Sequence, residues 1–321
     1  MLSPPRPLNA QGLPRRVGVE LEFGELDPLP AAQLIADRFG GQQVELGAHR
    51  FAVRDSRLGN FTIELDISSA HAEQRANADM LDELIDEMRV AWGHVGKLWM
   101  PHEIAAPPVA FDALPEIDAL IADLRNAGAV GTEGGLLYAF GLHFNPEVAS
   151  FEIAHLLSVL RAYLLAAPWL REQGDIDTVR RLSPFIDPFP DDYIAYVIDA
   201  TYTPGLERFV ADYLTWNPTR NRELDLFPLF AHVAPALFAS RIDDKQTKPR
   251  PTWHWRLPNS RVGVPGWSIL PDWSRWVVVE RLAEDAARIE ALAQLWRKAR
   301  ARDDFDSYLQ ASRAWIEPLG H

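Results

Sequence analysis

Four short segments of this sequence alternate strictly between apolar and other residues, and this pattern constrains the fold more than any other feature. The segments are Arg16–Phe23, Phe61–Ile67, Tyr138–Asn145 and Thr252–Leu257. A period of two, with Val, Ile, Phe, Trp or Tyr on one face, is typical of β-strands that are buried on one side. The chain therefore predicts a sheet that has one apolar and one polar face.

Between and after these segments, apolar residues recur at helical spacing. The spacing predicts helices within Glu73–Trp92, at Leu114–Leu124, after an N-cap at Ser150, and over about 275–300. The last helix would carry Glu284 and Arg288 as an i, i+4 pair. Strands before and after a helical middle, roughly 150–238, predict one α+β domain over 16–321 with a largely antiparallel sheet and a helical insertion. The late strand near Trp253 would pair with the early ones.

The charge balance excludes several classes of partner. The 321 residues include 32 Lys+Arg, 45 Asp+Glu and no Cys, for a net charge of -13. Excess acid repels phosphate backbones and anionic lipid, so neither nucleic acid nor a membrane is an expected partner. No apolar run approaches the roughly 20 residues of a membrane helix. The Pro-rich residues 1–15 lack a signal-peptide pattern, and we expect a flexible arm on a cytoplasmic protein.

The polar faces of the four strands carry an unusual set of side chains. They are Glu20 and Glu22, Glu64 and Asp66, His143 and Asn145, and His254 and Arg256. A solvated face explains any one strand alone, but together these faces have no Lys, and Gly18 leaves room on the sheet. Carboxylates this close repel one another unless a cation joins them or some are protonated. Carboxylates, imidazoles and a nearby Arg are the parts of a Mg²⁺–nucleotide site.

Several segments resemble, in order, a known family. They are Val17–Phe23, Asp66–Ser68 (a D-x-S triplet), Pro101–Pro108 with Glu103, Tyr138–Asn145 and Trp253–Asn259. Together they resemble the amidoligase family, which comprises carboxylate–amine ligases related to glutamate–cysteine ligase and glutamine synthetase. The resemblance runs from about residue 16 to 261 and implies that 16–321 form one catalytic domain.

The resemblance implies a glutamine-synthetase-like fold, in which antiparallel strands form a funnel for ATP and divalent cations, with helices on one face. The implied activity is ATP-dependent amide formation through an acyl phosphate. The substrates would be small-molecule or peptide carboxylates and amines, of amino-acid or peptide-like character.

By position, the resemblance makes Glu20, Glu22 and Glu103 ligands of Mg²⁺, and His143 a further ligand or a phosphate contact. Arg256 would neutralise phosphate charge in the transition state. The carboxylates Glu64 and Asp66 of the second strand are further candidate ligands.

Two residues depart from the family pattern. His254 stands where the family usually has Glu, and an imidazole is a poorer ligand for Mg²⁺, which points to Mn²⁺ or places that metal position in doubt. Asn145 stands where a second His is common, and its amide can still orient a phosphate or a water.

Three arginines outside the strand faces are candidate clamps for a carboxylate or a phosphate. Arg220 and Arg222 lie in the segment 217–222, and Arg261 follows the last predicted strand. Helix capping and surface ion pairing are the alternative roles for this group.

Two other functions remain open from the sequence. A relative that keeps the fold but has lost transfer would bind nucleotide or a partner without turnover, and His254 motivates this reading. A metal-dependent hydrolase could use the same carboxylates and imidazoles to activate water without ATP.

Overall fold

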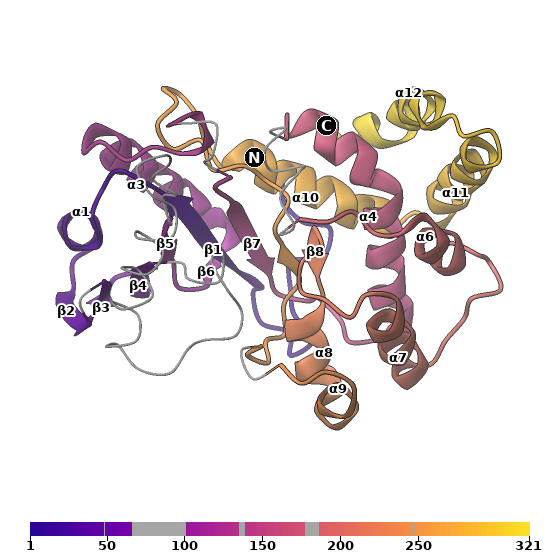
Figure 1. Ribbon diagram of the computed structural model, residues 1–321, viewed down its shortest axis with the longest axis horizontal. Helices are drawn as coiled ribbons and strands as arrows, with labels where there is room; N and C mark the ends of the chain where they lie inside the picture. Colours follow the sequence, from indigo (N-terminus) through magenta and orange to yellow (C-terminus); the bar gives the residue numbers. More distant parts are fainter. Residues whose placement is uncertain (48, 66–100, 135–138, 177–185, 245–246) are drawn as a thin grey trace, which may run out of the picture.

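The computed structural model describes residues 1–47, 49–65, 101–134, 139–176, 186–244 and 247–321. Within these residues one sheet has the strand order β2-β3-β4-β5-β1-β7-β9-β8, with β6 beside β1, and its strand pairs are antiparallel. The strands are β1 (Arg16–Phe23), β2 (Gln42–Gly47), β3 (Arg50–Ser56), β4 (Gly59–Leu65), β5 (His102–Ala105), β6 (Val109–Ala110), β7 (Leu142–Pro146), β8 (Leu224–Asp225) and β9 (His254–Trp255). The predicted α+β class with a large antiparallel sheet is confirmed (Figure 1).

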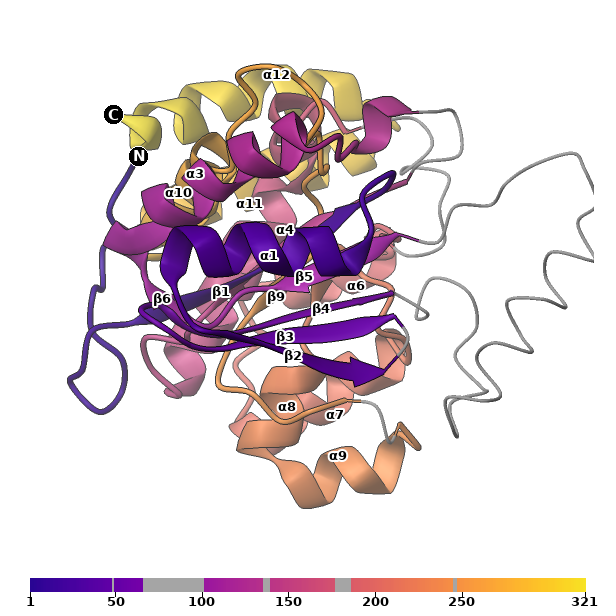
Figure 2. The same ribbon diagram turned by 90° about the vertical axis from the view of Figure 1, so that its left-hand side faces the viewer.

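Helices lie on both sides of this sheet. Figure 2 shows α1, α3 and α10 above the strands and α8 and α9 below them. The helices are α1 (Pro28–Phe39), α3 (Leu114–Asn126), α4 (Ile153–Gln173), α6 (Asp191–Val197), α7 (Leu206–Trp216), α8 (Phe227–Val233), α9 (Pro235–Arg241), α10 (Leu270–Ala283), α11 (Ala286–Arg300) and α12 (Phe305–Ile316), with 3₁₀ turns at Phe111–Ala113, Thr132–Gly134 and Glu317–Gly320.

The central strand β1 has the bounds that its alternation predicts. Its apolar residues Val17, Val19, Leu21 and Phe23 are at most 5% exposed. Val19 and Leu21 line a small apolar space together with residues of α3, so this face packs on the helical layer. The opposite face of β1 carries its glutamates.

The other predicted strands are shorter or shifted. β4 begins two residues before the predicted start, and the predicted end at Ile67 lies outside the described residues, as does the predicted helix Glu73–Trp92. β9 spans only two residues, because Thr252 and Asn259 on either side of it make isolated bridges instead of a continuous ladder. It pairs with β7 as the returning strand was expected to do.

The predicted terminal helix is wrong in one respect, because it is two helices. α10 ends at Ala283 and α11 begins at Ala286. Asp285 leaves the helical conformation (φ -116°, ψ 88°), and its side chain accepts a hydrogen bond from the backbone N–H of Arg288. Arg288 therefore pairs with Asp285 at 2.9 Å rather than with Glu284, which pairs with Arg6.

Helix α4 also differs from the prediction. It begins at Ile153 after Glu152, and Ser150 instead accepts the backbone N–H of Glu152 in the preceding turn. Contrary to the expectation from the sequence, α4 is long and apolar enough to cross a membrane by length and composition. An 18-residue window has a mean hydropathy of 1.5, but 67% of that window is buried inside the structure. Such burial is typical of a core helix.

The Pro-rich segment of residues 1–15, expected to form a flexible arm, contacts α10 near both of its ends. The backbone N–H of Leu2 donates to Ser274 Oγ, and Trp273 Nε1 donates to the carbonyl of Leu2. Arg15 makes two hydrogen bonds of 2.6 and 2.8 Å to Glu280, and both side chains are at most 5% exposed. This buried pair joins the start of β1 to α10.

Replacing Arg15 by Met should destabilise the protein by about 3–5 kcal/mol, because it leaves the buried Glu280 carboxylate without its partner. Urea-induced unfolding measures the loss. The control is Arg6→Met, which breaks the exposed pair with Glu284 and should cost less than about 1 kcal/mol. Equal losses in the two variants would show that the Arg15–Glu280 pair does not anchor the segment.

Candidate functional site

The register of four neighbouring strands gathers the polar side chains. In β1, Glu20 lies opposite His143 of β7, and Glu22 lies opposite Glu103 of β5. On the far side of β7, β9 brings in His254. Antiparallel partners directly opposite each other have Cβ atoms about 4.5–5.5 Å apart, so the side chains converge.

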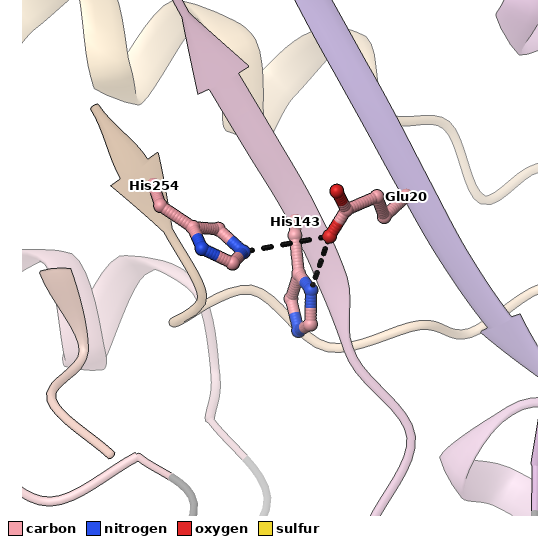
Figure 3. A group of neighbouring side chains, drawn as sticks. All are labelled: Glu20, His143 and His254. Atoms are coloured by element: carbon pink, nitrogen blue, oxygen red, sulfur yellow. Dashed lines mark hydrogen bonds and ion pairs between the residues drawn. The ribbon is translucent and has the colours of Figure 1, made fainter. Parts of the chain in front are cut away.

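Glu20, His143 and His254 form the first group, and they point toward one another from three strands (Figure 3). Glu20 Oε2 lies 3.2 Å from His143 Nδ1 and 3.4 Å from His254 Nε2. The other oxygen, Glu20 Oε1, accepts a hydrogen bond of 2.9 Å from Asn145. Both histidines and Asn145 are at most 8% exposed, so this group is shielded from solvent.

Glu22, Glu103 and His143 form a second group beside the first. His143 Nε2 lies 3.6 Å from Glu22 Oε1, while Glu22 Oε2 accepts the backbone N–H of Gly141 at 2.7 Å. In each group, one candidate ligand atom per residue lies within 4.8 Å of the others. His143 belongs to both groups, so the two candidate metal positions are adjacent.

Burial and mutual contacts control the charge of these groups. Burial alone would raise the pKa of Glu20, but the hydrogen bond with His143 and the nearby imidazole of His254 hold that pKa well below its usual range. Burial lowers the pKa of His143 to about 3, although its hydrogen bond to Glu20 opposes this effect. An ionised Glu20 thus faces a neutral His143 at neutral pH.

Asp225 of β8 is a member of the site that sequence reasoning missed. It is fully buried, lies 3.6 Å from His254 Nδ1, and accepts the backbone N–H of Phe227. Arg220 and Arg256 also contact its Oδ2, at 3.3 and 3.4 Å. Although burial opposes ionisation, His254 and the two arginines lower the pKa of Asp225 to about 2. A two-residue strand shows no alternation that could have revealed it.

Of the predicted arginines, the structure brings two to this site. Arg220 and Arg256 meet at Asp225, and Arg250, which was not predicted, lies 3.4 Å from Glu20 Oε1. Arg222 instead donates to Asn217 and to the carbonyl of Pro188. The alternative structural role fits these contacts of Arg222.

Arg261 is likewise occupied outside the group. Its guanidinium donates to both the carbonyl and the carboxylate of Asp175, at 2.6 and 2.9 Å. These contacts tie the chain after β9 to the end of α4 and do not bring Arg261 to Glu20.

The two carboxylates predicted on β4 have different outcomes. Glu64 lies opposite Glu103, but it is about two-fifths exposed and forms an ion pair of 2.9 Å with Arg50. It therefore lies at the rim of the site rather than between the histidines. Asp66 lies outside the described residues.

Gly18 gives Asn145 the space it occupies on the sheet. The two residues are directly opposite each other in the β1–β7 ladder. A Cβ atom at position 18 would lie 3.4 Å from Asn145 Cβ and 3.5 Å from Asn145 Nδ2. A methyl group would touch Asn145, and a longer side chain would displace it from Glu20.

One comparison with known proteins identifies the family of this chain. A family model described as "Putative amidoligase enzyme" matches residues 13–278, a range that contains all the strands of the site. The family's description names a class of ligases. Since the match covers most of the chain, this protein belongs to the amidoligase family, and the resemblance drawn from the strand motifs is confirmed. Comparisons with curated proteins and with solved structures found no match.

Replacing His143 by Gln should flatten the dependence of stability on pH. Below the ordinary pKa of 6.5 the unfolded chain binds a proton that the folded chain, with a pKa of about 3, does not. The free energy of unfolding therefore decreases as the pH falls from 7 to 5. His143 contributes up to about 1.4 kcal/mol per pH unit to this decrease. Urea unfolding at several pH values, with a chelator present, measures the slope.

The matched control is His232→Gln, because His232 lies on α8 and is exposed. That variant should keep the slope of the unchanged protein. If the free energy of unfolding of His143→Gln depends on pH as steeply as that of the unchanged protein, His143 is not a neutral, buried group.

Proposed function

We propose that the two groups around His143 form the catalytic site of an ATP-dependent carboxylate–amine ligase. The observation that carries the proposal is the convergence of Glu20, Glu22 and Glu103 on one imidazole, in a chain of the amidoligase family. The large antiparallel sheet, polar on this face, supports the glutamine-synthetase-like funnel that we include in the proposal.

The donor set fits a magnesium ion. Glu22 and Glu103 face each other from paired strands, and a cation between them would offset their repulsion. Mg²⁺ prefers oxygen ligands and commonly binds through one or two carboxylates together with substrate phosphates. Glu22 and Glu103 would hold this ion, with Glu20 in the adjacent group on the other side of His143. The ion would neutralise charge on the phosphates of ATP, and Mn²⁺ is the alternative ion.

The chain's own residues would supply the remaining charge and orientation. Arg250, Arg220 and Arg256 carry permanent positive charge within 3.4 Å of Glu20 or Asp225. Such planar donors suit phosphate and carboxylate oxygens. Asn145 would hold Glu20 in position through their hydrogen bond. Phosphoryl transfer depends mainly on positioning and charge stabilisation of this kind.

The proposed reaction has two steps. An oxygen of the substrate carboxylate attacks the γ-phosphorus of ATP, the bond to ADP breaks, and an acyl phosphate forms. An amine then attacks the acyl carbon, phosphate leaves, the nitrogen loses a proton, and an amide results. The acid and the amine would be amino-acid or peptide-like, and the use of ATP fits the cytoplasmic location that we expect.

One observation favours a second candidate, a metal-dependent hydrolase. Glu20, His143 and His254 are the two-histidine, one-carboxylate set that also activates water in metal-dependent hydrolases. A hydrolase would work without ATP, whereas a relative that has lost transfer would bind ATP without releasing phosphate.

Binding of ATP with Mg²⁺ should stabilise the unchanged protein and should not stabilise Glu22→Gln. A ligand at a hundredfold excess over its dissociation constant adds about 2.7 kcal/mol to the stability of the native state. Thermal unfolding with ATP, with and without Mg²⁺ or Mn²⁺, measures the shift. Glu45→Gln, an exposed strand carboxylate on β2, is the control and should keep the full shift. A metal-independent shift, or none, would contradict a metal–nucleotide site at Glu22.

Glu20→Gln should abolish ATP turnover while leaving the melting temperature of the ligand-free protein nearly unchanged. Phosphate release is measured with a mixture of amino acids and dipeptides that supplies both acids and amines. The ligase requires release to depend on ATP together with these substrates. Hydrolysis of amides or of phosphate esters without ATP would favour the hydrolase. Binding of ATP without release of phosphate would favour the inactive relative.

A further inference from the structure

We infer that Glu20, His143 and His254 form a site for a first-row transition-metal dication, distinct in its preference from the oxygen-rich position at Glu22 and Glu103. This inference takes one point from the proposed function, namely that the neighbouring position at Glu22 and Glu103 binds Mg²⁺. Binding of the transition metal itself depends on neither ATP nor turnover.

The donor atoms of this group are the first support. Two imidazole nitrogens and one carboxylate oxygen lie within 4.8 Å of one another, and the three side chains come from three adjacent strands. Imidazole suits Zn²⁺, Co²⁺ and related ions, whereas Mg²⁺ prefers oxygen and dehydrates reluctantly. Three protein ligands also leave coordination positions open for water or substrate.

The second support is an unsatisfied atom that points into the group. Among the described residues, His254 Nε2 is buried and has no hydrogen-bond partner, although Glu20 Oε2 lies 3.4 Å away. His254 as a whole is 7% exposed, so water does not readily satisfy this nitrogen. A buried ring nitrogen that faces a carboxylate without a hydrogen bond is explained by a cation between the two.

Asp225 gives His254 the orientation that a metal ligand needs. It faces Nδ1 at 3.6 Å, and its carboxylate is itself held by Arg220, Arg256 and the backbone of Phe227. A neutral imidazole carries one N–H, and a carboxylate at Nδ1 favours placing the proton there. The lone pair of Nε2 then faces Glu20. Such carboxylate–histidine–metal arrangements are common around protein-bound metals, so we assign Asp225 as a positioning residue.

His143 separates the two positions. It contacts Glu20 through Nδ1 and Glu22 through Nε2, but a neutral imidazole has only one lone pair to give. If Nδ1 binds the metal beside Glu20, the Nε2 proton remains for Glu22. The position at Glu22 and Glu103 then offers oxygen alone, which suits Mg²⁺.

The test is a titration of the metal-stripped, full-length protein with Co²⁺, followed by the visible absorption of the bound ion. No nucleotide is present, and Mg²⁺ in large excess serves as the competitor. The unchanged protein should bind Co²⁺ against this excess. His254→Glu exchanges a nitrogen ligand for oxygen, so its preference for Co²⁺ over Mg²⁺ should fall by roughly tenfold or more. Asp225→Asn should weaken Co²⁺ binding by roughly 10- to 100-fold.

His232→Gln removes an exposed histidine outside the group and should bind Co²⁺ as the unchanged protein does. Equal Co²⁺ preference in His254→Glu and the unchanged protein would overturn the inference, as would the absence of Co²⁺ binding. If the variants do not fold, X-ray absorption spectroscopy of the unchanged protein with bound Co²⁺ counts the imidazole ligands of the ion. Two imidazoles are expected, and one or none would overturn the inference. If the Co²⁺ titration overturns this inference, the expected stabilisation by ATP that requires Glu22 is unaffected. The two proposals can therefore be rejected independently.

Discussion

The antiparallel register of β1 between β5 and β7 is the constraint on which the candidate site depends. Because side chains alternate across a strand, a slip of one residue would turn Glu20 into the core and expose Val19. The apolar face of β1 is almost fully buried against helices, so its packing excludes that slip. The burial of one face therefore fixes which side chains meet on the other.

Opposite charges in the site come from different parts of the chain. The carboxylates Glu20 and Glu22 belong to the central strand, whereas Arg220 and Arg250 come from irregular segments around the helical insertion. Concentrating carboxylates on a buried face is costly unless cations compensate them. These later segments therefore supply positive charge to a site whose geometry the sheet determines.

The sequence predicted the part of the site that has a long local pattern. Eight alternating residues gave the bounds of β1 and the faces of Glu20 and Glu22 correctly. Asp225 was not predicted, because its strand is only two residues long. The charge of its buried carboxylate is offset by arginines, among them Arg256, which is distant in sequence. Asp285 escaped for a similar reason, since an acidic residue fits the helical period and only its backbone conformation reveals the break. Short elements and long-range compensation have no periodic signature.

Because Gly18 has no side chain, it limits which substitutions this sequence can accept during evolution. Asn145 occupies the space above Gly18 and donates its amide to Glu20. A bulkier residue at position 18 would be tolerated only beside a smaller residue at position 145, and Glu20 would then lose its amide donor. The two positions are therefore expected to co-vary among descendants of this chain, as one inherited unit that spans two strands.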